Sequence, residues 1–315
     1  MIWLDSLIKW LKGPAPTTPV QVTPVATPEP LKPTVHTIGL RDAVKIALDL
    51  SASFEGPGKF GNIVGNFDGQ GLTCGALGWI WKNGNQQAMV LECEKKYPGI
   101  VLRLMPSLGA TYLKLCRTPV AQSFQQVSSW SDHGQVMPVY KKELQLFWSS
   151  PQMVEVQVDH AMRIANEAIK GLDAYCGGDE WPLQEFLFFF DIEVQNGSLA
   201  GINLDDVVKF IDGSGGYHEA ASKVLQWVLA RCPLVNYNTW KEEIEQGGAG
   251  HDKIELFVLA HLRSLKAREQ YQDEVMNRKA TIALLRGYVN REMYDLRQKV
   301  PSIEKTWVSL SQKLA

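Results

Sequence analysis

The chain is organised around residues 53–79, which read SFEGPGKFGNIVGNFDGQGLTCGALGW. The stretch is rich in glycine, which destabilises helix interiors and central strands, so neither element can run through it. Glycine, Asn and Asp favour turns and left-handed backbone conformations. We therefore predict an irregular loop or short hairpin that carries two carboxylates, Glu55 and Asp68.

A pair of carboxylates on such a loop suits glycoside hydrolysis. One carboxylic acid protonates the leaving oxygen, and a second carboxylate activates water or stabilises the sugar cation. Apolar neighbours such as Phe54 favour a protonated carboxyl group at Glu55, whereas a glycine-rich turn leaves Asp68 solvated and ionised. Either residue alone is more simply structural, so the hypothesis depends on the pair.

Helical periodicity surrounds this loop. Apolar residues from Leu40 to Leu50 recur at helical spacing, and that helix would run into Glu55 at its C-terminal end. The run 181–197, WPLQEFLFFFDIEVQNG, is apolar on nearly all sides and predicts a buried core helix that stops at Gly197. Further helices are expected at 85–96, within 100–115, and at 151–175, 204–210, 219–229 and 254–276. The fold class is therefore mainly α (α+β), with two lobes, a small irregular β hairpin that carries Asp68, and a central helix near 183–196.

The motif residues show a family resemblance. Glu55, the turn Asp68-Gly69-Gln70-Gly71-Leu72-Thr73 and the segment Gly75-Ala76-Leu77-Gly78-Trp79 resemble the catalytic segment of bacterial chitosanases in the lysozyme-like superfamily. They are still more similar to bacterial and phage relatives with a FEG…GNFDGQGLT…GALQW pattern. The resemblance implies that Glu55 is the general acid, that Asp68 is the general base and that Thr73 helps to hold the attacking water. It also implies an inverting mechanism.

Two departures from the chitosanase pattern affect the substrate. The spacing from Glu55 to Asp68 is a few residues shorter, so the connecting hairpin must differ. Chitosanases place an acidic residue after the second glycine cluster to bind a glucosamine ammonium, and Asn85 corresponds to it here. An amide suits an N-acetyl group or hydroxyls better than a cation, which favours an N-acetylated polymer such as peptidoglycan.

The resemblance covers most of residues 37–300 and is strongest at 53–79, 186–197 and 276–296. The polar end of the apolar helix is expected to line the substrate groove, although its Asp191 and Gln195 could equally satisfy groups within the core. The run from Arg278 to Tyr294 is expected to close the opposite lobe, with both residues in the groove or in packing. The predicted substrate-binding residues are Asn66, Gln70, Trp79, Asn85, Gln157, Asp191, Gln195 and Asn196.

These observations predict a hydrolase of β-1,4-linked amino-sugar polymers, with peptidoglycan as the expected substrate. One alternative is a chitosanase, which acidic residues along the groove would favour. Another is a non-catalytic glycan-binding protein of the same fold, which a Glu55 turned away from the groove or held in an ion pair would favour.

Composition narrows the classes of partner. The net charge of -2 provides no bulk attraction to nucleic acid or an acidic membrane. Five cysteines without CxxC or Cys/His ligand spacing argue against a zinc site and against a full disulfide framework. The glycine clusters lack the Lys-Ser/Thr of a nucleotide-binding loop, so neither metal nor cofactor is expected. The pair Asp132-His133 is most simply a surface pair.

The N-terminal residues differ from the rest. Residues 1–13 begin with MIWLDSLIKWLK, an amphipathic segment too short to span a bilayer and without the features of a standard signal peptide. It predicts either an interfacial helix or a docking segment for a partner protein. Residues 14–35 hold seven of the sixteen prolines and form an extended linker, and residues 36–315 are the expected catalytic domain. We expect delivery to the cell wall by phage lysis or specialised secretion, where an immunity protein could act as a further partner.

Overall fold

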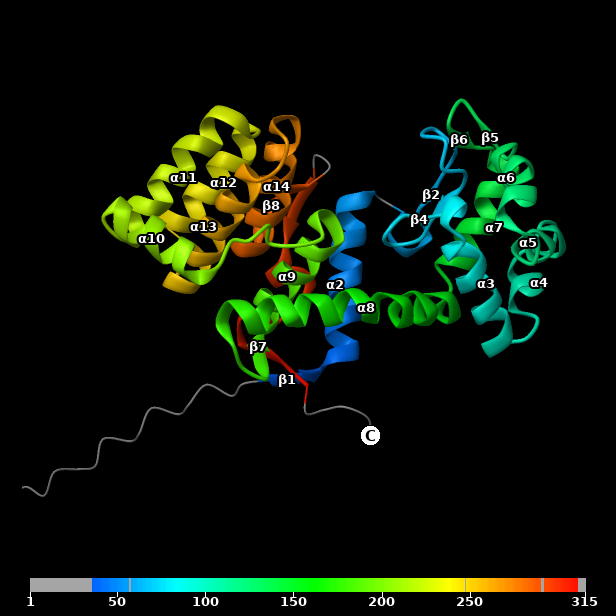
Figure 1. Cartoon of the computed structure of the whole chain (residues 1–315), viewed down its shortest axis with the longest axis horizontal. Coiled ribbons are helices and arrows are strands. Elements are labelled where there is room, and N and C mark those ends of the chain that lie inside the picture. The colour runs from blue at the N-terminus through cyan, green and yellow to red at the C-terminus, as the bar shows by residue number, and fades with distance from the viewer. Residues whose placement is uncertain (1–35, 57, 247, 290–291, 311–315) are drawn as a thin grey trace, which may run out of the picture. The chain divides into compact units, whose positions relative to one another are not determined.

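The computed structural model describes residues 36–310 except 57, 247, 290 and 291 (Figure 1). The predicted segments 1–13 and 14–35 lie outside the described residues. The described part is mainly helical with small two- and three-stranded sheets, which confirms the mainly α (α+β) prediction. None of its helices is long and apolar enough to cross a membrane.

One hydrophobic core contains the buried aromatic residues between positions 81 and 148, among them Trp81, Tyr112 and Trp148. Antiparallel strands β2, β3 and β4 form a small sheet beside it, and β5 and β6 form a separate hairpin. The elements of this part are η1 Lys59–Gly61, β2 Ile63–Val64, β3 Thr73–Cys74, β4 Trp79–Ile80, η2 Trp81–Asn83, α3 Asn85–Lys96, α4 Ile100–Leu104, α5 Gly109–Cys116, α6 Val120–Ser128, β5 Ser131–Asp132, β6 Gln135–Val136 and α7 Pro138–Trp148.

A second, larger core is organised around helix α9, Leu183–Asn196, whose residues from Phe186 to Ile192 are all buried. Helices α2, α8 and α14 pack against α9. The other elements of this part are α2 Leu40–Glu55, α10 Leu204–Ser214, α11 Tyr217–Arg231, α12 Leu234–Glu245, α13 His251–Leu265, η3 Glu269–Tyr271, α14 Gln272–Ala283, β8 Arg286–Val289, β9 Glu292–Asp295, α15 Leu296–Lys299 and η4 Ile303–Lys305.

Helix α8, Pro151–Cys176, joins the two cores. Its 26 residues correspond to a length of about 39 Å at 1.5 Å per residue. Met153 and Val156 belong to the first core, and the buried positions from Val158 to Leu172 belong to the second. The side chain of Ser150 accepts a hydrogen bond from the Met153 amide and caps the helix. Helix α2 packs across α8 (Figure 1).

A three-stranded sheet brings the two ends of the described chain together. Strand β1, His36–Gly39, pairs in parallel with β10, Thr306–Ser309, and β10 pairs antiparallel with β7, Glu180–Pro182. Strand β1 leads directly into α2 at Leu40, so the sheet anchors the start of the helix that ends at Glu55. The C-terminal strand therefore supports the position of Glu55 from the far end of α2.

One predicted helix is wrong. The sequence predicted a single helix over 254–276, but α13 ends at Leu265 and α14 begins at Gln272. Helix α14 packs extensively against α13. This reversal buries the residues from Val275 to Ala283 other than Asn277. The exposed residues Lys266 and Arg268 lie in the connection.

Candidate functional site

Glu55 is the last residue of α2, as the sequence predicted. Gly56 follows with φ +153°, and its amide bonds the carbonyl of Ala52. The Glu55 side chain is 39% exposed, and its Oε1 accepts a hydrogen bond from Arg278 Nη1 at 2.6 Å. Among the described residues Oε2 has no partner. Glu55 is therefore held by one oxygen while the other faces solvent, instead of lying in the apolar surroundings expected from Phe54.

Arg278 is held in place by a buried ionic cluster. Its Nη2 donates to Asp191 Oδ1 at 2.6 Å, and its Nε donates to Asp191 Oδ2 at 3.3 Å. Lys279 forms an ion pair with the same carboxylate and also donates to the Asp191 carbonyl oxygen at 2.8 Å. Ser51 Oγ donates to Asp191 Oδ1 at 3.0 Å. The cluster therefore links α2, α9 and α14 and holds Arg278 against Glu55.

Burial and the neighbouring charges shift the pKa values of the three residues in this cluster. Burial by itself would raise the pKa of Asp191, but the Arg278 and Lys279 charges and their hydrogen bonds hold that pKa well below its usual range. Burial lowers the pKa of Lys279 to about 8 against the opposing effect of Asp191. Burial also lowers the pKa of Arg278, but Asp191 and Glu55 outweigh it and raise that pKa. Arg278 therefore remains a fixed cation beside Glu55.

Aromatic residues fix the same region from the other side. The Arg278 guanidinium lies 4.9 Å from the centre of the Phe54 ring, which is within the range of a cation–π contact. The Phe54 and Tyr294 rings are 6.0 Å apart, and the Tyr294 hydroxyl donates to Ser53 Oγ at 3.4 Å. Tyr294 is buried, so it acts in packing, which was one of its two predicted roles.

Asp68 lies on the loop between β2 and β3 and is exposed. Its Oδ1 accepts from the Gln70 amide at 3.1 Å, and Oδ2 has no partner among the described residues. Asn66 Oδ1 accepts from the Gly71 amide at 2.9 Å, and the Asn66 amide donates to Ser131 Oγ at 3.1 Å. The side chain of Asn66 therefore shapes the turn that presents Asp68, and Gln70 contributes its backbone to the same turn.

Glycine is required at one crowded position of this loop. Gly71 has φ +85°, and a Cβ there would lie 3.0 Å from the Phe124 ring. Thr73, two residues later, begins β3 and pairs with Val64 and Ile80. Its side chain is half-buried, and its hydroxyl has no partner among the described residues. The hydroxyl thus remains available to a water molecule on the strand that follows Asp68.

Two pockets flank the C-terminal turn of α9. The first, of about 460 Å³, is lined by Trp79, Arg163, Glu193 and Gly197 among others. The second, of about 510 Å³, includes Gln195 and Asn196 in its lining. The three predicted binding residues Trp79, Gln195 and Asn196 therefore lie at this helix end, and the Asn196 Oδ1 is buried without a hydrogen-bond partner. Asn85 is exposed at the start of α3 and lines neither pocket.

Two predicted binding residues are corrected by the structure. Gln157 is fully buried: its Oε1 accepts from the Ala76 amide at 2.9 Å, and its Nε2 donates to the Trp148 carbonyl at 2.8 Å. Asp191 is also fully buried, with its carboxylate occupied by the cluster behind Glu55. Neither side chain can contact a substrate in this structure, because each polar group is used to join elements of the fold.

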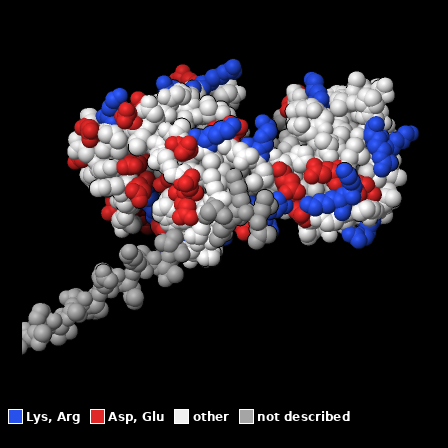
Figure 2. Space-filling model, turned by 60° about the horizontal axis from the view of Figure 1, so that its bottom comes forward, with Lys and Arg blue, Asp and Glu red and all other residues white. Residues whose placement is uncertain are grey.

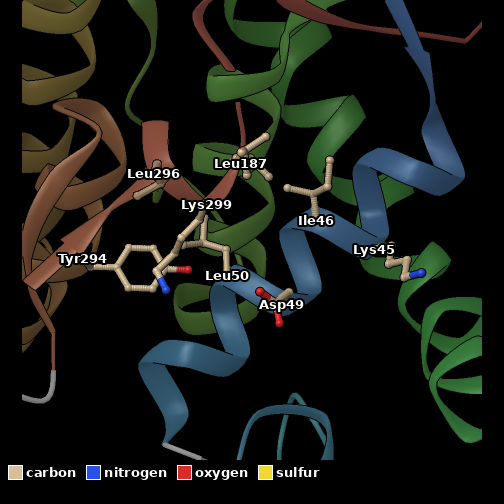
Figure 3. A pocket seen from close by; sticks show the side chains of 9 residues that line it. Lys45, Ile46, Asp49, Leu50, Leu187, Tyr294, Leu296 and Lys299 are labelled. Carbon is tan, nitrogen blue, oxygen red and sulfur yellow. The ribbon is translucent and has the colours of Figure 1, made fainter. Parts of the chain in front are cut away.

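A smaller cavity of about 210 Å³ lies between α2 and residues 294–300 (Figure 3). Tyr294 and Lys299 line one side, with the Lys299 ammonium 4.5 Å from the Tyr294 ring centre. Asp49 on α2 lies opposite them (Figure 3). Neither Glu55 nor Asp68 lines this cavity, so we do not assign the chemistry to it.

Sequence reasoning missed two residues near the candidate site. Lys279 is fully buried and paired with Asp191; the signal was a second cation next to Arg278 at the start of an apolar run. Phe67, next to Asp68, is 69% exposed, and an aromatic residue at the tip of a glycine-rich turn could have been identified from the sequence.

On the face shown in Figure 2, acidic and basic side chains are interspersed.

Neither the known protein-family models nor the curated protein sequences show a significant match to this chain.

Proposed function

We propose that the chain hydrolyses a β-1,4-linked amino-sugar polymer, the glycan strand of peptidoglycan in particular, with Glu55 as the acid and Asp68 as the base. One observation carries this proposal. Each of the two carboxylates is anchored through a single oxygen, to Arg278 for Glu55 and to the Gln70 amide for Asp68, and the second oxygen has no partner among the described residues. The resemblance of residues 53–79 to lysozyme-like chitosanases supports the same assignment.

The anchored geometry supports a division of labour. Glu55 Oε2 donates a proton to the leaving glycosidic oxygen, and Arg278 at Oε1 stabilises the carboxylate charge that this transfer creates. Asp68 Oδ2 accepts a proton from the attacking water, and the Thr73 hydroxyl orients that water. Attack from the face opposite the leaving group inverts the anomeric carbon, which requires the carboxyl groups to stand roughly 6.5–9.5 Å apart when substrate is bound. Delivery to the cell wall is part of the same proposal.

One observation favours a second candidate, a non-catalytic glycan-binding protein. The ion pair between Glu55 and Arg278 is a feature that a purely structural carboxylate would also have. Glu55 differs from the structural Asp191, whose carboxylate is fully buried: its side chain is 39% exposed, and its Oε2 has no partner among the described residues. We therefore favour the hydrolase and test it against this second candidate.

The test is product analysis on peptidoglycan sacculi and on chitosan with the wild type, Glu55→Gln and Asp68→Asn. We expect reducing muropeptides of inverted anomeric configuration from the wild type and a loss of about 100-fold or more in either variant, the usual contribution of a general acid or base. Asp132→Asn, at an exposed carboxylate outside the site, should retain full activity. Unchanged turnover by a folded Glu55→Gln protein refutes the assignment.

The remaining outcomes separate the alternatives. Products from chitosan alone would assign the protein to the chitosanases despite Asn85. Binding to sacculi without any products from the wild type would favour the non-catalytic candidate.

A further inference from the structure

The pocket of about 510 Å³ beside Gln195 and Asn196 has an unusual lining. It contains three cationic side chains, Arg263, Lys266 and Arg268, and one carboxylate, Glu274. Among the described residues, none of the three cations forms an ion pair with Glu274 or with any other carboxylate. The lining therefore carries an excess of positive charge that the fold itself does not neutralise.

Arg263 is the decisive residue because it is only 6% exposed. Its Nε donates to the Ser198 carbonyl oxygen at 2.8 Å. Within the described part of the chain, its Nη1 and Nη2 atoms have no hydrogen-bond partner. Burial lowers the pKa of Arg263, because it partly removes the guanidinium from water. A partly desolvated charge without a counter-charge is costly to the fold, and arginine stays charged at any ordinary pH. Retaining it is best explained by an anionic ligand that pairs with it when bound.

The pocket is connected to Glu55 through a chain of polar contacts. Gln195 lines the pocket, and its Oε1 accepts from Lys279 Nζ at 2.9 Å. Lys279 pairs with Asp191, which holds Arg278, which in turn bonds Glu55. Gln195 Nε2 has no partner among the described residues and can serve as a further donor to a ligand. The pocket is therefore built onto the cluster that positions the proposed acid.

The rim of the pocket suits a sugar. The Tyr271 side chain is 47% exposed there and offers an apolar ring face with a polar tip. Lys266 and Arg268 are exposed beside it. An exposed aromatic ring and a largely buried arginine in the lining of one pocket suit a ring-shaped ligand with an acidic substituent, because arginine binds carboxylates through two parallel hydrogen bonds.

We propose that this pocket binds a carboxylate carried by the glycan, with Arg263 as the specificity residue, so that the enzyme selects acidic amino-sugar polymers over neutral or cationic ones. The inference rests on the proposed function, and it makes the free lactyl carboxylate of a muramic acid unit without a stem peptide the recognised feature, because an attached peptide converts that group into a neutral amide. Chitosan, which carries ammonium groups instead, would be disfavoured by the same three cations.

The experiment measures binding to the full chain with Glu55→Gln, which prevents turnover. Calorimetry compares an oligosaccharide of alternating N-acetylglucosamine and N-acetylmuramic acid with its carboxamide derivative. We expect the acidic form to bind about 10-fold more tightly or better, the usual worth of a hydrogen bond to a charged group. Adding Arg263→Gln should bring the ratio close to one, and adding Lys266→Gln should reduce it in part. Arg103→Gln, which removes an exposed charge on α4, should leave the ratio unchanged.

Thermal unfolding of the same variants separates recognition from structure. If Arg263 serves the ligand, Arg263→Gln should keep or raise the unfolding temperature while it abolishes the preference. If that variant does not fold, the binding preference is measured with Lys266→Gln and Arg263→Lys instead. Lys266→Gln removes one positive charge, and Arg263→Lys keeps the charge but removes the paired guanidinium donors. Equal binding of the two oligosaccharides to the starting protein, no binding of either, or a preference that survives both pocket variants would overturn the inference.

The two proposals can fail separately. Cleavage of sacculi by the wild type without any preference for the acidic oligosaccharide would support the hydrolase proposal and refute carboxylate binding in the pocket. A binding preference that depends on Arg263, in a protein that cleaves no glycan, would support the pocket proposal and refute the hydrolase proposal.

Discussion

Replacing Asp191 by Asn should strongly destabilise the protein, because Asp191 is the counter-charge for two buried cations. Arg278 is 7% exposed and Lys279 is fully buried, so neither can recover its hydration when the carboxylate is lost. Breaking a buried ion pair from one side costs about 3–5 kcal/mol. Asn retains one acceptor oxygen, so we expect about 3 kcal/mol for Asp191→Asn and about 5 kcal/mol for Asp191→Ala. At about 2–4 °C per kcal/mol for a domain of this size, the Asn variant should melt roughly 6–12 °C lower.

The assay is guanidinium chloride unfolding at pH 7, followed by circular dichroism, with Asp132→Asn as the control. The side chain of Asp132 is 74% exposed, so its variant should lie within about 0.5 kcal/mol of the wild type. Adding Lys279→Met to Asp191→Asn should recover part of the loss, because one unpaired cation is removed. A loss below about 1 kcal/mol for Asp191→Asn, or no recovery in the double variant, would refute the reasoning.

Two further predictions concern pH and packing. Burial, together with the charges of Asp252 and Glu255, raises the pKa of Glu185 to about 7. Between about pH 4 and pH 7 the native state keeps the Glu185 carboxyl group protonated, whereas the unfolded state releases that proton. The stabilisation from this group is therefore complete below about pH 4 and is lost as the pH rises through 7. Glu185→Gln should therefore gain stability relative to the wild type from pH 4 to 8, by on the order of 2–3 kcal/mol; unfolding free energies measured across this range test it, and a constant difference would contradict it. Gly75→Ala should cost about 1–3 kcal/mol and displace Trp79, because φ is +83° and a Cβ would lie 2.7 Å from the Trp79 ring. Gly99→Ala, with φ +80° and no atom within 4 Å, isolates the backbone contribution, and equal losses in denaturant melts of the two variants would rule out crowding at Gly75.

Much of the candidate site could be predicted from the sequence because its signals are local. Glycine spacing predicted the turn that presents Asp68, and the structure places Asp68 on an exposed loop closed by hydrogen bonds from Gln70 and Gly71. The predicted substrate-binding role of Gln157 was wrong, and for Asp191 the alternative role inside the core is the one observed. A polar residue on an amphipathic helix looks the same in the sequence whether it faces a ligand or another element. Only the surrounding elements decide which groups its side chain meets.

Helix boundaries and fold class were within reach of the sequence alone. Helices α2, α3 and α9 end or begin where periodicity and glycine predicted, including the stop at Gly197, whose φ is +74°. These features depend on neighbouring residues, so the mainly α fold and the place of Glu55 at a helix end could be predicted without the structure. Only the packing of distant elements places Arg278, 223 positions away in the chain, against Glu55, and buries Arg263 without a counter-charge among the described residues. Periodicity shows that a helix face is buried, but not which distant side chains share that interior.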